Sequence, residues 1–227
     1  MQPENRNKIK KTSCAFVARR QVEFWKDSRS LWEHAARATS GNVVAHVKLG
    51  CLFDAEGKLD EAVAEFKESL RMAPACAFAH DDWGLALLRR GMSGAAAMHF
   101  SEALRADPDF AEAHADLGTA LVLEGKVPEA VAEYAEALRL APDNGPARAN
   151  LGDAFGRLGR VDEAVVETSK AVRIDPANAQ WRCNLGRLLA AKGDFAAARR
   201  EFAAALRIDP ANADARRGLD EMEARAR

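Results

Sequence analysis

The sequence predicts an all-α protein in which a unit of two helices repeats five times and stacks into a solenoid. Three observations predict this fold. Prolines recur every 34 residues, two columns of glycines recur with the same period, and aromatic residues make up only 7% of the 227 residues. Columns in phase over five periods are typical of stacked repeats, and an alanine-rich, aromatic-poor chain favours closely packed helices over a β-sandwich. The columns are Pro74, Pro108, Pro142, Pro176 and Pro210; Gly57, Gly91, Gly125, Gly159 and Gly193; and Gly50, Gly84, Gly118, Gly152 and Gly186.

The first helix of each unit is predicted from an apolar stripe around a glycine. In the first unit, Leu49 precedes Gly50 and Phe53 follows it by three residues, a spacing that places all three on one helix face. The glycine has no side chain and permits close approach of the partner helix. A second glycine, Gly57 in this unit, suits the left-handed conformation that ends a helix.

The second helix of each unit is predicted to end at the column proline and to carry one large side chain. This position holds an aromatic residue in four units and Thr168 in the fourth. Asp or Asn beside the proline is expected to cap the helix that follows. The capping candidates are Asp107, Asp109, Asp143, Asn144, Asp175, Asn178, Asp209 and Asn212.

The 34-residue pattern resembles the tetratricopeptide repeat. This resemblance implies a right-handed α-solenoid whose first helices line a concave groove that binds peptides or partner proteins. The five expected repeats are 43–76, 77–110, 111–144, 145–178 and 179–212. Residues 213–227 are expected to form a capping helix, 20–42 an N-terminal helix with half a repeat, and 1–19 a basic tail or helix.

A second resemblance concerns the segment upstream of the repeats. Residues 20–28, followed by Leu31, Trp32 and His34, are similar to the junction in bacterial membrane proteins of glycosyltransferase type that carry a tetratricopeptide tail. This implies, as one alternative, that the chain is the soluble tail of such a protein or a stand-alone relative that has lost the membrane part. No transferase active-site residue can be assigned in it.

The second, sixth, ninth and thirteenth positions of the first helices share one helix face, because spacings of three and four residues return to the same side. The family resemblance implies that this face lines the groove. Asn150 and Asn184 are similar to the asparagine ladder in the repeats of O-GlcNAc transferase, and their amides can hydrogen-bond the backbone of an extended peptide. Asp82 and Asp116 extend this row. The basic carboxylate clamp of chaperone-binding relatives is not matched. The predicted groove residues are Lys48, Phe78, Asp82, Glu112, Asp116, Asn150, Asp153, Asn184 and Arg187.

Charge is unevenly distributed along the predicted repeats. Residues 43–110 carry 7 basic and 11 acidic residues, 111–144 carry 2 and 7, and 145–212 carry 11 and 8. A ligand along the groove is therefore expected to place basic groups near Asp81, Asp82, Glu112 and Asp116 and an acidic group near Arg157 and Arg187. An alternative is that these charges only keep the surface solvated.

Catalytic, metal and cofactor sites are not predicted. His46, His80 and His114 recur at one repeat position, but their helices pack about 8 to 10 Å apart, too far to share one zinc ion, and a packing role is expected. The four cysteines lack zinc or disulfide spacing. The chain also has no HExxH, GxSxG or phosphate-loop motif.

The sequence therefore predicts a non-catalytic scaffold that binds a protein or peptide ligand in its groove. Near-neutral charge, with 33 basic and 34 acidic residues, argues against nucleic-acid binding. No apolar run approaches the roughly 20 residues of a membrane span, so a cytoplasmic location is expected, or a periplasmic or membrane-associated one for a tail of a membrane protein. A further alternative is self-assembly through a helix around residues 16–25.

Overall fold

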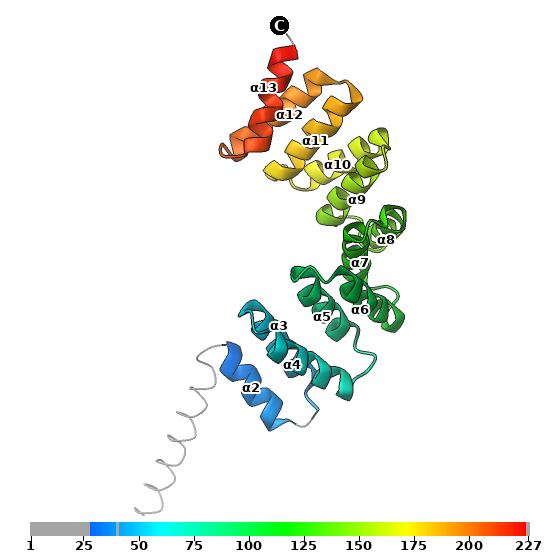
Figure 1. Cartoon of the computed structure of the whole chain (residues 1–227), viewed down its shortest axis with the longest axis vertical. Coiled ribbons are helices and arrows are strands. Elements are labelled where there is room, and N and C mark those ends of the chain that lie inside the picture. The colour runs from blue at the N-terminus through cyan, green and yellow to red at the C-terminus, as the bar shows by residue number, and fades with distance from the viewer. Residues whose placement is uncertain (1–27, 40, 226–227) are drawn as a thin grey trace, which may run out of the picture. The chain divides into compact units, whose positions relative to one another are not determined.

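The structure is a computed structural model that describes residues 28–39 and 41–225. This part of the chain forms α-helices and contains no strand (Figure 1). The predicted tail at 1–19, the self-assembly segment at 16–25 and most of the second resemblance lie outside the described residues. The helices are α2 (Ser28–Ala38), α3 (Val43–Ala55), α4 (Leu59–Met72), α5 (Ala77–Arg89), α6 (Ser93–Ala106), α7 (Ala111–Leu123), α8 (Val127–Leu140), α9 (Gly145–Arg157), α10 (Val161–Ile174), α11 (Ala179–Lys192), α12 (Phe195–Ile208) and α13 (Ala213–Arg225).

The predicted all-α helical repeat is confirmed. From α3 to α12, helices of 13 or 14 residues alternate with short turns. The chain divides within α5 into two compact units, of which the first ends at Ala86 and the second begins at Leu87.

The core of the first unit is built on the predicted glycine and aromatic columns. A Cβ atom on Gly50 of α3 would lie 2.6 Å from the ring of Phe66 on α4, so only glycine fits there. Phe66 is 1% exposed and stacks on Trp83 of α5, with 6.1 Å between ring centroids. The small residue thus lets a large one on the next helix fill the core.

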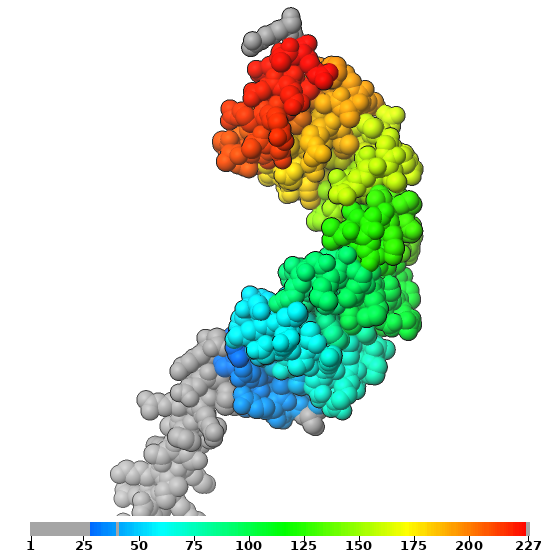
Figure 2. All heavy atoms as spheres, in the orientation of Figure 1, coloured from blue at the N-terminus to red at the C-terminus, as the bar shows by residue number. Residues whose placement is uncertain are grey.

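In the second unit, each helix from α6 to α13 contacts the next one along the chain. The first helices of successive repeats also contact one another, α7 with α9 and α9 with α11, and α11 contacts α13. The space-filling view shows the atoms of this unit following one another in chain order from green to red (Figure 2). The first helices therefore form a continuous row.

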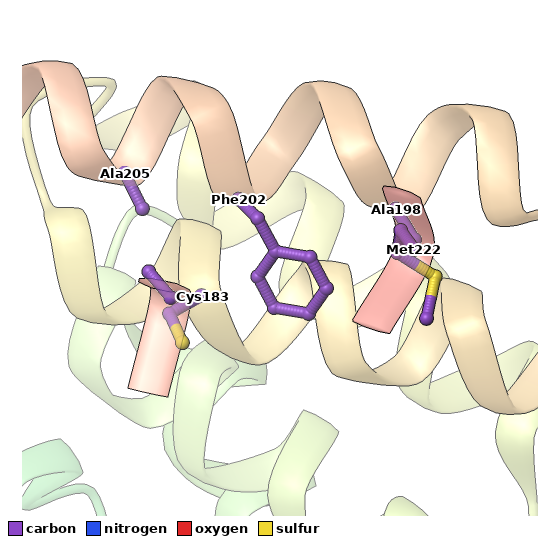
Figure 3. Close-up of a cluster of buried hydrophobic side chains, with 6 residues drawn as sticks. Cys183, Ala198, Phe202, Ala205 and Met222 are labelled. Atoms are coloured by element: carbon purple, nitrogen blue, oxygen red, sulfur yellow. The ribbon is translucent and has the colours of Figure 1, made fainter. Parts of the chain in front are cut away.

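The last helix, α13, completes the core of the second unit. Phe202 of α12 is 2% exposed and packs with Cys183 of α11 and Met222 of α13 (Figure 3). A Cβ atom on Gly186 or Gly218 would lie within 3 Å of the Phe202 ring. The ring is therefore enclosed by α11 on one side and α13 on the other, so α13 caps the stack.

The turns within the repeats follow the predicted glycine column. All five column glycines have positive φ, between 73° and 91°, which is the left-handed conformation expected at a helix end. Asn144 and Asn178 accept hydrogen bonds from Ala147 N–H and Trp181 N–H, as expected of capping residues.

The predicted cap of α7 is wrong. The N-cap residue, which directly precedes this helix, is Phe110, and its side chain makes no capping bond. Asp107 instead accepts a hydrogen bond from the Asp109 N–H, which forms a local turn before the helix begins.

Within residues 28–39 and 41–225, no helix combines the length and the apolar character that crossing a membrane requires.

Candidate functional site

The candidate site lies on the row of first helices in the second unit. We call its side chains the polar row, defined by Glu112 and Asp116 on α7, Asn150 and Asp153 on α9, and Asn184 and Arg187 on α11. Asp116 and Asn184 are partly buried, and the other four are exposed. These positions lie beside buried residues such as Leu117, Leu151 and Leu185, which hold the helices that carry the row.

The acidic end of the polar row is electrostatically strained. Burial, together with the negative charge of Glu112, raises the pKa of the Asp116 carboxyl to about 6. No cation offsets the charge of Asp116 among the causes of this shift. A basic group from a ligand would therefore gain from approaching this carboxylate.

A buried tyrosine lies close to the acidic end of the polar row. Tyr134 of α8 is 2% exposed, and its hydroxyl lies 3.1 Å from Thr119 Oγ1 on α7. Because Thr119 donates its proton to the Ala115 carbonyl, the tyrosine hydroxyl donates to Thr119. Burial raises the pKa of the Tyr134 phenol, and the charges of Asp153 and Asp116 raise it further.

The two amides of the polar row differ in their hydrogen bonds. Asn184 Oδ1 accepts a hydrogen bond of 3.1 Å from Gln180 Nε2, so its Nδ2 group remains available to donate. Asn150 is exposed and makes no side-chain hydrogen bond in the described part of the chain. Both amides can therefore offer a donor to a ligand.

The basic end of the polar row contains one paired and one unpaired guanidinium. Arg157 Nε donates to Asp153 Oδ2 at 2.7 Å. Arg187 is exposed and forms no ion pair among the residues that the structure describes. The net positive charge at this end thus comes from Arg187.

A pocket of about 270 Å³ opens between α9 and α11 beside the basic end. Thr168 of α10 lies at the position that carries an aromatic residue in the other repeats, and it lines this pocket. Sequence reasoning did not predict the pocket, although the substitution of Thr168 in the aromatic column was its visible signal. The lining residues are Ala149, Asp153, Gly156, Arg157, Thr168, Asn184, Arg187, Leu188 and Ala191.

Three predicted groove residues belong to the first unit and are described apart from the polar row. Lys48 on α3 and Phe78 on α5 are exposed, the latter by 65%. Asp82 on α5 is partly buried. They remain predictions as ligand-binding residues.

The histidine column, His46, His80 and His114, was predicted to pack between repeats, and the contacts of His114 illustrate such packing. His114 Nδ1 lies 2.7 Å from Glu133 on the second helix of its repeat, and its Nε2 lies 3.1 Å from the Pro108 carbonyl of the preceding repeat. Arg182 occupies this position on α11, where it bonds Glu201 and the Pro176 carbonyl. No cluster of metal-ligating side chains occurs in residues 28–39 and 41–225.

Comparison with known families matches the repeats directly. Models described as tetratricopeptide repeat match residues 43–76, 82–145, 121–191 and 179–212. Together these matches span more than half of the chain. The chain belongs to the tetratricopeptide repeat family, whose helical arrays serve as scaffolds for protein–protein interaction.

Solved structures share the fold at low identity. YrrB, described as a tetratricopeptide protein with an unusual peptide-binding site, is 23% identical with a TM-score of 0.69, over 83% of this chain and 97% of that chain. MamA from Desulfovibrio magneticus RS-1 is 20% identical with a TM-score of 0.69, over 77% and 98%. PilF from Pseudomonas aeruginosa is 18% identical with a TM-score of 0.70, over 81% and 89%. No curated protein matches by sequence.

Proposed function

We propose that this chain is a non-catalytic scaffold whose polar row binds an extended segment of a partner protein. The observation that supports the proposal is the recurrence of polar side chains at equivalent positions on three first helices that contact in series. A backbone in extended conformation offers carbonyl and amide groups at regular intervals. The amides of Asn150 and Asn184 can bond those groups without recognising particular side chains.

The spacing of the row suits an extended segment. Packed helices lie about 8 to 10 Å apart, and an extended chain rises about 3.3 Å per residue, so consecutive first helices would contact about every third residue of the ligand. A basic residue of the ligand would lie near Asp116 and an acidic residue near Arg187. This charge order gives the bound segment a direction along the row.

The proposal is tested with a peptide selected from a random peptide display library on the full chain. Replacement of both Asn150 and Asn184 by Ala is expected to weaken binding of that peptide by tenfold or more, because each lost hydrogen bond contributes about 1 kcal/mol. The dissociation constant is measured by fluorescence anisotropy. The melting temperature should stay nearly unchanged, since neither side chain is part of the core.

Arg173→Ala serves as the control, because Arg173 is an exposed residue of α10 outside the polar row. An unchanged dissociation constant in the Asn150/Asn184 double variant would show that the segment binds elsewhere on the chain.

A further inference from the structure

The pocket between α9 and α11 exists at the one repeat of the second unit where the aromatic column is interrupted. Tyr134 and Phe202 fill the space between successive repeats. Tyr134 packs against Leu151 and Ala154 of α9, and Phe202 packs against Met222 of α13. Thr168 is 2% exposed and too short to reach the next repeat in the same way. The missing ring leaves room beside α11.

The walls of this pocket are apolar. Ala149 and Gly156 of α9 line it on one side, and Leu188 and Ala191 of α11 line it on the other. A Cβ atom on Gly156 would meet Leu188 at 3.3 Å, so the two helices close the pocket at this point. Such walls suit the methylene groups of a side chain.

The remaining lining groups are hydrogen-bond donors and charges. Asp153 is occupied by Arg157 through an ion pair of 2.7 Å. Arg187 has no ionic partner in the described residues, and the Nδ2 group of Asn184 is available as a donor. An unpaired guanidinium beside an amide donor is suited to a carboxylate.

We propose that this pocket receives a glutamate side chain of the bound partner segment. Its methylene groups would lie against Leu188 and Ala191, and its carboxylate would accept hydrogen bonds from Arg187 and Asn184. The inference rests on the proposed function of the polar row and adds a sequence preference at one ligand position. Thr168 acts here as the residue that makes the space.

Other side chains fit these groups less well. The unpaired guanidinium of Arg187 repels a lysine, and a glutamine carries no negative charge to pair with that guanidinium. A phenylalanine would fill the volume but would cover the donors of Arg187 and Asn184 without offering an acceptor, which is costly. An aspartate has one methylene group fewer than a glutamate, so it places less apolar surface against the pocket walls.

The test uses pools of fluorescent nonapeptides that are acetylated at the N-terminus and amidated at the C-terminus. The central residue is Glu, Asp, Gln, Lys or Phe, and the flanking positions are mixtures of the same amino acids in every pool. Binding to the full chain is measured by anisotropy. We expect the Glu pool to bind about fivefold more tightly than the Gln pool.

Two variants test the pocket by independent means. Arg187→Gln removes the unpaired charge, and Ala191→Phe places a ring at the pocket from an exposed helix position. Each is expected to abolish the preference for Glu. Ala135→Phe, at an exposed position of α8 away from the polar row, is expected to retain it.

The outcomes separate this inference from the proposed function. If the Glu and Gln pools bind equally and Asn150→Ala weakens both, the polar row binds peptides and the glutamate pocket is wrong. If no pool binds, both proposals are overturned. A further pool with a free C-terminal carboxylate and no central acid tests whether the pocket binds the C-terminus of a peptide in place of a glutamate side chain. Tighter binding of that pool would also overturn the side-chain assignment.

Discussion

Asp116 shows how one residue of the polar row affects stability. Its folded-state pKa of about 6 lies above the ordinary value of 3.8, because burial and the charge of Glu112 disfavour the carboxylate. At pH values between these two pKa values, the folded chain binds more protons than the unfolded chain. The free energy of unfolding therefore falls as the pH rises through about 6.

Asp116→Asn is expected to stabilise the protein at pH 8 and to have about half that effect at pH 5, because the loss of stability develops between about pH 4 and pH 6. The gain at pH 8 is about 1 to 3 kcal/mol, since each unit of pKa shift corresponds to about 1.4 kcal/mol. Urea unfolding at the two pH values measures this difference. An equal gain at both pH values would contradict the assignment of the strain to the ionised carboxylate.

At the scale of the helix pair, one repeated contact joins the elements. Arg182 on α11 donates to Glu201 on α12 at 2.9 Å and to the Pro176 carbonyl at 2.8 Å. It thereby links its own helix pair to the end of the repeat before it. Arg148 makes the same two kinds of bond to Glu167 and Pro142. Arginine can make both bonds at every pH, whereas a neutral imidazole at this position supplies only one donor.

Arg182→Ala is expected to lower the free energy of unfolding by about 1 to 3 kcal/mol, because it leaves Glu201, which is 24% exposed, without its charged partner. Arg217→Ala is the matched control, since Arg217 pairs with Asp214 on the exposed surface of α13 and should cost less than about 1 kcal/mol. Chemical denaturation compares the two. Equal losses would mean that the contact between repeats contributes no more than a surface ion pair.

At the scale of the whole molecule, each described unit buries its core by stacking helices, so the ends of a stack need a cover. In the second unit, α13 provides it. Cys183 is fully buried, and burial raises the pKa of its thiol. Both effects keep this cysteine unreactive while α13 is in place.

Ending the chain after Asn212 is expected to speed the reaction of Cys183 with a thiol reagent by tenfold or more, in a variant in which it is the only cysteine. Removal of α13 takes Met222 away from the cluster that encloses Cys183 and Phe202. A variant with Cys51 as the only cysteine reports on the first unit and should react at the same rate with or without α13. If the rate at Cys183 does not change, α13 is not the cover of this core.

Much of the fold was predictable because its cause is local and periodic. The 34-residue columns predicted the helix pairs, the left-handed glycines and the close approach of the partner helix at the other glycine column, as at Gly118 beside Tyr134. The cap of α7 was mispredicted, because Asp107 had a competing local bond within the preceding turn. Repetition of a column shows what every repeat shares, and it says little about a contact made in only one of them.

The polar row was predictable only as a list of positions. Helical spacing places Asn150 and Asn184 on equivalent faces, but the bond from Gln180 to Asn184 and the raised pKa of Asp116 depend on burial and on neighbouring side chains. The pocket is a clearer case. Thr168 was visible in the sequence as a substitution in the aromatic column. The space beside it depends on how closely α9, α10 and α11 pack around this shorter side chain, which the sequence does not show.

The sequence by itself determined that this chain is a tetratricopeptide array, because a 34-residue period records the packing that every repeat requires. Only the tertiary structure decided which polar groups are paired, which are strained and where space remains. Those properties arise between helices that are far apart in sequence, and they depend on distances that no periodic pattern contains.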